Sequence, residues 1–140
     1  MATNVLVDAG FMVGLLSRRD SQHRWAVEQA ERFPPPWRTC EAALFEAFHL
    51  LGGRGTPALR ALLRREAVVI AFDLADNLEA VLKFMEKYAD VPASLADASL
   101  VRMSETLAAP MLLTTDIDFR IYRRHGRQVV PCMTPGRSYR

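Results

Sequence analysis

Four acidic residues lie in or next to apolar segments, where a charged carboxylate needs a cation or a hydrogen-bond donor as its partner. Asp8 directly follows a short run of apolar residues, and Asp116 follows another such run after two threonines. Glu46 and Asp97 each lie in a stretch that is otherwise mostly apolar. Ionised carboxylates are rarely buried unless they are paired or bound to a metal. We therefore expect the four acids to converge in one pocket.

Such a pocket predicts metal-assisted phosphate chemistry. Two carboxylates ~4 Å apart repel each other by about 4 kcal/mol at an effective dielectric constant of about 20. The pocket is therefore stable only when some of the groups are protonated or when a divalent cation binds. A set of oxygen ligands favours Mg²⁺ or Mn²⁺ over Zn²⁺. A hard cation polarises a phosphoryl oxygen and lowers the pKa of a bound water, so that the water can attack.

Each acid also has a purely structural explanation. Asp8 could cap the helix that follows it, and Asp97 stands three residues after a serine, which is the spacing of a capping box. Asp116 and Asp118 suit the positive end of a helix. Glu46 has the weakest explanation of this kind, namely that a lone acid on a mostly buried helix points to solvent.

The elements that would position these acids alternate along the chain. Strands are expected at residues 4–7, 37–38, 67–72, 111–114 and 128–130, and helices, N-caps included, at 11–16, 20–33, 39–51, 56–65, 76–88, 94–107 and 117–124. This alternation predicts a parallel sheet with helices on both faces. Sites in such sheets form at the carboxyl ends of the strands, where Asp8 and Asp116 lie.

The composition is that of a folded protein without a membrane segment. The 140 residues are 50% hydrophobic and 24% charged, which predicts a single domain over residues 1–140. The apolar runs are far shorter than a membrane span, and the first residues lack the pattern of a signal peptide, so a cytoplasmic location is expected. Cys40 and Cys132 belong to no CxxC or Cys/His cluster, which argues against structural zinc.

The positive charge gathers near the C-terminus. The net charge is only +2, but six arginines and no acidic residue follow Asp118. Arg120, Arg123 and Arg124 are spaced as neighbours on one face of a short helix. They follow the acidic segment directly and could bind RNA phosphates, since arginine binds phosphate through two parallel hydrogen bonds. Tyr122 could stack on a base. A solvated basic helix is the alternative.

Other polar features have simpler explanations. The glycine-rich segment 52–55 resembles a phosphate-binding loop only superficially, because it lacks the GK[ST] pattern and follows a helix rather than a strand. Its first two glycines are interpreted as the stop signal of the preceding helix. His23, His49 and His125 could act as general bases, because histidine titrates near neutrality, but a packed histidine is the simpler explanation.

Several segments together resemble a known family. They are VLVDAG at residues 5–10, TCEAALFE at 39–46, SLADA at 94–98 and LTTDIDF at 113–119. In this order they resemble PIN-domain ribonucleases, and most of all the VapC-type toxins of bacterial toxin–antitoxin modules. The resemblance covers nearly the whole chain, and residues 94–105 and 112–126 carry its most specific part.

The resemblance implies a fold and an activity. The fold would be a three-layer α/β/α sandwich around a mostly parallel sheet of about five strands. The activity would be that of a metal-dependent endoribonuclease, with Asp8 and Asp97 as principal ligands of Mg²⁺ or Mn²⁺. Glu46 and Asp116 would complete the pocket directly or through water, and Asp118 matches a further acid of the family. Asp90 matches an acid often found before the helix of Asp97, with a plain loop residue as the alternative.

The resemblance also implies partners: an RNA substrate, a cognate antitoxin that fills the pocket, and a second copy in a homodimer. The chain would then be the toxin of a type II module. Phe11 and Ser17 depart from the family pattern, which puts the fit of the substrate in doubt rather than the chemistry. The alternative is a PIN-like module that binds RNA or protein without catalysis, and the complete set of four acids argues against it.

Overall fold

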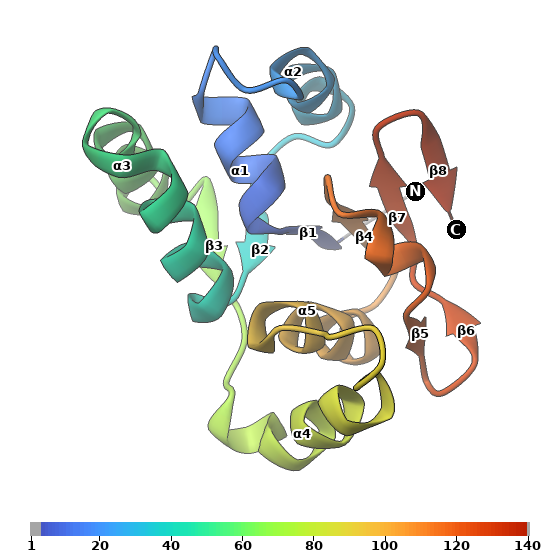
Figure 1. Cartoon of the computed structure of the whole chain (residues 1–140). Coiled ribbons are helices and arrows are strands. Elements are labelled where there is room, and N and C mark those ends of the chain that lie inside the picture. Colours follow the sequence, from blue (N-terminus) through green and yellow to red (C-terminus); the bar gives the residue numbers. More distant parts are fainter. Residues whose placement is uncertain (1–3, 140) are drawn as a thin grey trace.

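A computed structural model describes residues 4–139 and has an α/β architecture (Figure 1). Within these residues a six-stranded sheet runs in the order β3-β2-β1-β4-β7-β8. All its neighbouring strands are parallel except β7 and β8, which are antiparallel. Its strands are β1 (Asn4–Val7), β2 (Trp37–Thr39), β3 (Val68–Ile70), β4 (Pro110–Leu113), β7 (Cys132–Thr134) and β8 (Arg137–Tyr139). The expected mostly parallel sheet is confirmed.

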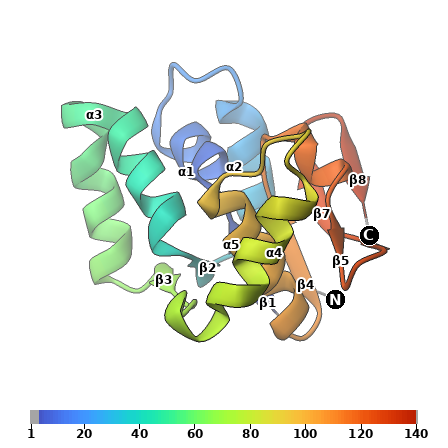
Figure 2. The same ribbon diagram turned by 60° about the horizontal axis from the view of Figure 1, so that its bottom comes forward.

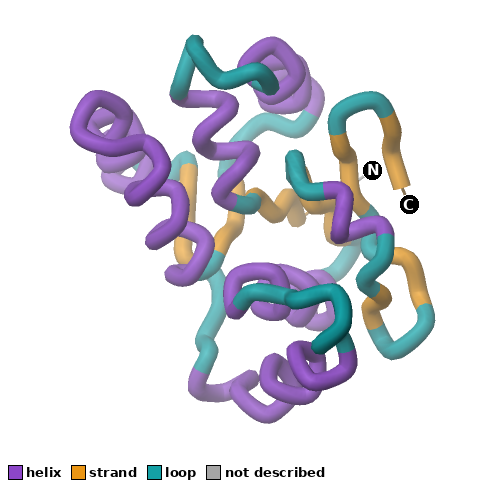
Figure 3. Tube along the Cα trace, in the orientation of Figure 1, coloured by secondary structure: helices purple, strands orange, loops and turns teal. Residues whose placement is uncertain are grey.

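Helices cover both faces of this sheet. They are α1 (Ala9–Leu16), α2 (His23–Arg32), α3 (Glu41–Arg64), α4 (Leu78–Lys87) and α5 (Leu95–Thr106), with short 3₁₀ turns η1 (Ala75–Asn77) and η2 (Ile117–Arg120). Figure 1 shows α1 and α2 on one side of the sheet and α4 and α5 on the other, and the strands form the layer between them in Figure 3. The view in Figure 2 shows α4 and α5 in front of the sheet.

The two central strands form the middle of the core. Leu6 and Val7 of β1 and Leu112 and Leu113 of β4 are fully buried. Continuous apolar runs of this kind are typical of parallel strands that are covered on both faces. Each such side chain contributes roughly 1.5–3 kcal/mol when it is removed from water. The register pairs Val7 with Leu113, so the residues that follow the two strands also lie side by side.

Helix α3 joins two helices that the sequence separates. The expected helices 39–51 and 56–65 form one element, which is broken at Gly52 (φ 63°, ψ −164°). The N-cap is Cys40 rather than the expected Thr39, because Thr39 belongs to β2 and its hydroxyl donates to the carbonyl of Val7 at 2.8 Å. No helix within residues 4–139 has both the length and the apolar character needed to cross a bilayer.

The expected helix 117–124 is wrong. The chain forms η2 and then a two-stranded antiparallel hairpin of β5 (Arg123–Arg124) and β6 (Gln128–Val129). His125 and Gly126 adopt positive φ angles of 49° and 81°, which end any helix and turn the chain. The expected edge strand 128–130 is therefore part of this hairpin, and β7 and β8 extend the main sheet instead.

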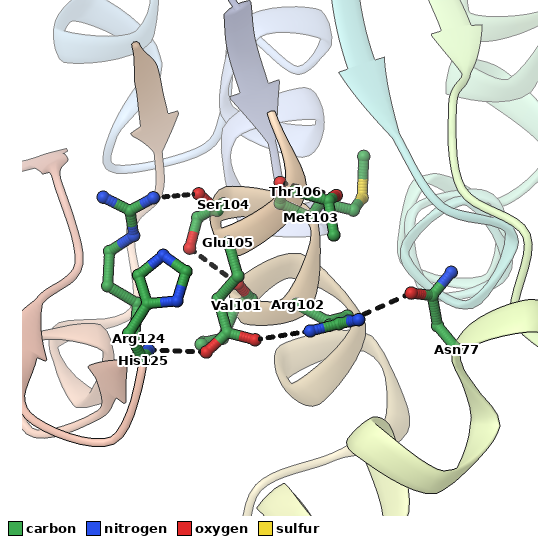
Figure 4. Close-up of polar contacts among 9 residues, drawn as sticks. All are labelled: Asn77, Val101, Arg102, Met103, Ser104, Glu105, Thr106, Arg124 and His125. Atoms are coloured by element: carbon green, nitrogen blue, oxygen red, sulfur yellow. Dashed lines mark hydrogen bonds and ion pairs between the residues drawn. The ribbon is translucent and has the colours of Figure 1, made fainter. Parts of the chain in front are cut away.

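Polar contacts attach the hairpin to α5 (Figure 4). The Arg124 guanidinium donates to the carbonyl of Ser104, and the His125 N–H donates to the Glu105 carboxylate at 2.6 Å. Glu105 also pairs with Arg102 at 3.3 Å, and Arg102 donates to the Asn77 side chain at 2.9 Å. The network therefore holds the hairpin against α5, and α5 against η1.

The break in α3 predicts opposite effects for two neighbouring glycines. Gly52 lies in a backbone region that is essentially restricted to glycine, whereas Gly53 has no positive φ. A Cβ atom at either position would meet no atom within 4 Å. Gly52→Ala should lower the free energy of unfolding by about 1–3 kcal/mol through backbone strain alone. Gly53→Ala should raise it by about 0.5–1 kcal/mol. Urea unfolding of both variants measures the difference, and equal effects would contradict it.

Candidate active site

The pairing of β1 with β4 brings the two strand-end acids together. Asp8 directly follows β1, and the residues after β4 lie beside it. The hydroxyl of Thr114 donates to the carboxylate of Asp8 and accepts a hydrogen bond from the N–H of Asp116 at 2.9 Å. Thr114 is fully buried and thus connects the ends of the two strands. Sequence reasoning missed this role, although a hydroxyl residue two positions before a strand-end acid is a usable signal.

Asp8 is a buried carboxylate with a shifted pKa. Only 7% of the residue is exposed, and its carboxylate accepts hydrogen bonds from the Phe11 N–H at 2.8 Å and from Thr114. Burial raises the pKa of Asp8 to about 7, and the charges of Asp116 and Asp97 act in the same direction, while the hydrogen bonds oppose the shift. Asp8 also caps α1, so its structural explanation holds as well.

Asp97 combines a helix cap with a place in the acidic cluster. Its N–H donates to the Ser94 hydroxyl at 3.0 Å, and its carboxylate accepts from the Ser94 N–H at 3.1 Å, which forms a capping box at the start of α5. Burial raises the pKa of Asp97, and the charges of Asp116 and Glu46 raise it further. The capping explanation is therefore correct without excluding electrostatic contact with the other acids.

Asp116 interacts electrostatically with both Asp8 and Asp97. The carboxylate of Asp116 accepts from the Asp118 N–H at 2.9 Å and caps η2. Its charge raises the pKa values of both Asp8 and Asp97. The charge of Asp118 acts on Tyr122, whose pKa is raised mainly by burial.

Glu46 approaches the cluster from α3. The residue is exposed, and its charge raises the pKa values of Asp97 and of the Cys40 thiol, both of which are raised mainly by burial. Glu46 is therefore within electrostatic range of Asp97 and on the solvent side of the cluster. Its exposure agrees with the structural explanation, in which a lone acid on a mostly buried helix points to solvent.

The donor set of this cluster fits a hard cation. Within residues 4–139, no group of three or more His, Cys, Asp or Glu side chains is arranged to hold a metal ion. Mg²⁺ usually keeps several waters and needs only one or two carboxylates from the protein. The carboxylates of Asp8 and Asp97 supply oxygen donors, and a bound cation would offset the burial and the like charges that raise their pKa values.

The three arginines that were predicted to bind RNA do not share a helix face. Arg123 donates to three backbone carbonyls at 2.6–3.1 Å, and Arg124 donates to a carbonyl of α5. Arg120 donates to the Thr134 hydroxyl at 2.7 Å. These guanidinium groups hold the segment after η2 in place, and their contact with RNA stays a prediction.

Tyr122 cannot stack on a base. The ring is fully buried and packs edge-on against Phe84, Tyr88 and Phe119, with centroids 5.1–5.5 Å apart. Its hydroxyl lies 3.5 Å from the carboxylate of Asp97. The stacking interpretation is therefore wrong, and Tyr122 supports the acidic cluster from the core.

The raised pKa of Asp8 predicts how the stability of the metal-free protein depends on pH. The folded state keeps a proton on Asp8 between the ordinary pKa of 3.8 and about 7, where the unfolded state has lost it. The free energy of unfolding should therefore fall by up to about 4 kcal/mol as the pH rises through this window. Asp8→Asn cannot ionise and should lack this part of the decline.

Urea unfolding in EDTA across this pH range measures the effect. Glu86→Gln is the control, because it removes an exposed carboxylate on α4. Parallel pH profiles for the wild-type protein and Asp8→Asn would contradict the assignment.

Comparison with known proteins identifies the fold. No family model matches the chain, and no curated protein matches it significantly. The structure is similar to the crystal structure of VapC20 from Mycobacterium tuberculosis, described as a toxin that cleaves the sarcin–ricin loop. The match has a TM-score of 0.73 and 22% sequence identity, and it covers 82% of this chain and 92% of VapC20. The chain therefore has the PIN-like fold that its resemblance to VapC-type toxins implies.

Proposed function

We propose that this protein is a metal-dependent endoribonuclease, acts in the cytoplasm and is the toxin of a type II toxin–antitoxin module. The observation that carries the proposal is the buried carboxylate of Asp8 at the carboxyl edge of the sheet. Burial raises its pKa, and the charges of Asp116 and Asp97 raise it further. The same fold occurs in VapC20, which is described as an RNA-loop-cleaving toxin.

In this proposal Asp8 and Asp97 hold the metal ion, which is Mg²⁺ or Mn²⁺. The ion would supply a polarised phosphoryl oxygen and a bound water of lowered pKa. The Phe11 N–H and Thr114 hydroxyl orient the carboxylate of Asp8, and the capping box at Ser94 orients that of Asp97. These contacts fix two ligand groups before the substrate arrives, which limits the entropy lost on binding.

Asp116 and Glu46 complete the proposed site. Asp116 is held by the hydrogen bond from the Asp118 N–H, and Glu46 extends from α3 into solvent. Both charges act on Asp97, so either group can contact the ion directly or through water. Asp118 has a supporting role, since its N–H fixes the carboxylate of Asp116.

Exposed apolar side chains support the proposed protein partners, which are an antitoxin and a second copy of the chain. Phe45 is 74% exposed on α3, and Ile70 and Ile117 are also largely exposed. Large apolar side chains of this kind bury well in a protein–protein interface. Sedimentation of the purified chain measures its self-association. Co-purification after co-expression with a short reading frame, if one lies just upstream of the gene, tests the antitoxin.

The proposal predicts cleavage that depends on the metal and on two carboxylates. Structured RNA should be cut with Mg²⁺ or Mn²⁺ present and left intact in EDTA. Asp8→Asn and Asp97→Asn should each lower kcat/KM by on the order of 100-fold or more, because a lost ligand removes several kcal/mol of charge stabilisation. Gel electrophoresis of the RNA products measures the rates.

Glu86→Gln serves as the matched control and should cut like the wild-type protein. Cleavage that neither aspartate substitution changes would disprove the metal site. RNA that binds but stays intact under all these conditions would favour the alternative of a non-catalytic module.

A further inference from the structure

A groove lies between the end of α1 and the middle of α3, apart from the acidic cluster. Its volume is about 330 Å³. Leu16, Leu50 and Leu51 form part of its apolar wall, and the residues around the break at Gly52 form part of its rim. Figure 1 shows α1 and α3 side by side, and the two helices pack against each other.

Three arginines line this groove. Arg18 and Arg19 follow α1, and Arg54 lies just beyond the break in α3. All three are exposed, and none of their side chains forms a hydrogen bond or an ion pair with residues 4–136, whose side chains are described. No acidic residue is among the described residues that line the groove. The groove therefore presents three positive charges that the protein itself does not neutralise.

The groove and the acidic cluster lie at opposite ends of the same helix. Asp8 caps the start of α1, and Arg18 and Arg19 follow its end. The eight residues of α1 span ~12 Å. Helix α3 likewise has an acidic residue, Glu46, nearer its start and an arginine, Arg54, beyond its break. The arginines therefore lie about one length of α1 from its capping carboxylate, a separation that a few nucleotides of single-stranded RNA can span.

We propose that Arg18, Arg19 and Arg54 bind phosphates of the RNA strand that flank the phosphate being cleaved. This inference rests on the proposed function. Arginine suits the task, because its planar guanidinium matches phosphate oxygens with two parallel hydrogen bonds. An acidic polypeptide carries charges of the same sign, but the alignment of the groove with the acidic cluster favours a substrate that occupies both.

The test compares two variants of equal charge. The groove variant carries Arg18→Gln, Arg19→Gln and Arg54→Gln. The control variant carries Arg24→Gln, Arg64→Gln and Arg65→Gln, three exposed positions outside the groove. Thermal unfolding verifies that both variants fold. Fluorescence anisotropy with labelled single-stranded RNA in EDTA then gives Kd over a range of salt concentrations, and labelled polyglutamate serves as a second probe.

The groove variant should bind RNA at least about tenfold more weakly than the control variant at low salt. The slope of log K against log salt should become shallower by about 1.4–2, because each lost phosphate contact of a single strand contributes about 0.7. With Mg²⁺ present, KM should rise while kcat changes little, since these arginines do not touch the reacting phosphate.

The outcomes separate this inference from the proposed function. If the wild-type protein cleaves RNA and the two variants bind RNA alike, the groove inference is wrong and the nuclease proposal stands. If the wild-type protein does not bind RNA, both are wrong. A groove variant that binds RNA like the control but loses polyglutamate would assign the groove to an acidic polypeptide and overturn the inference.

Discussion

The parallel pairing of β1 with β4 places the carboxylate of Asp8 beside the residues that follow β4, in a region that water hardly reaches. Every other feature of the acidic cluster depends on this placement. Burial alone would disfavour the charged form of Asp8, and hydrogen bonds from Phe11 and Thr114 recover part of that cost. The remaining imbalance makes the site a place where added positive charge is stabilising.

Three acids of the cluster also cap helices through hydrogen bonds with backbone N–H groups. Asp8 caps α1, Asp97 closes a capping box on α5, and Asp116 caps η2. A cap fixes the side chain at the start of a helix, and the helices in turn are fixed by the packed sheet. The carboxylates are therefore oriented by secondary structure, and the structural and the chemical explanations of these residues apply together.

The sequence predicts the sheet and the position of its acids well, because the patterns involved are local. Apolar runs mark the buried strands, and strand-end acids mark the edge where sites form. The segment after η2 could not be predicted in this way. Arg120, Arg123 and Arg124 have helical spacing, but positive φ angles at His125 and Gly126 turn the chain into a hairpin.

In the candidate site, too, local patterns predict which acids are present, but not the contacts that depend on how the helices pack. The electrostatic contact of Asp97 with Asp116 depends on how α5 packs on the sheet, which no spacing along the chain reveals. The apolar neighbours of Glu46 do not reveal that this residue is exposed on α3. The burial of Tyr122 likewise depends on Phe84 and Tyr88, which come from α4 and the residue after it.

The two outer strands of the sheet are short. β3 and β8 each span three residues. Short outer strands offer few unpaired backbone groups to another chain, which is one way in which proteins avoid continuous sheets between molecules. Association with another molecule by strand addition is thus disfavoured. Contact through helical surfaces, which expose Phe45 on α3 and Leu82 on α4, is not restricted in this way.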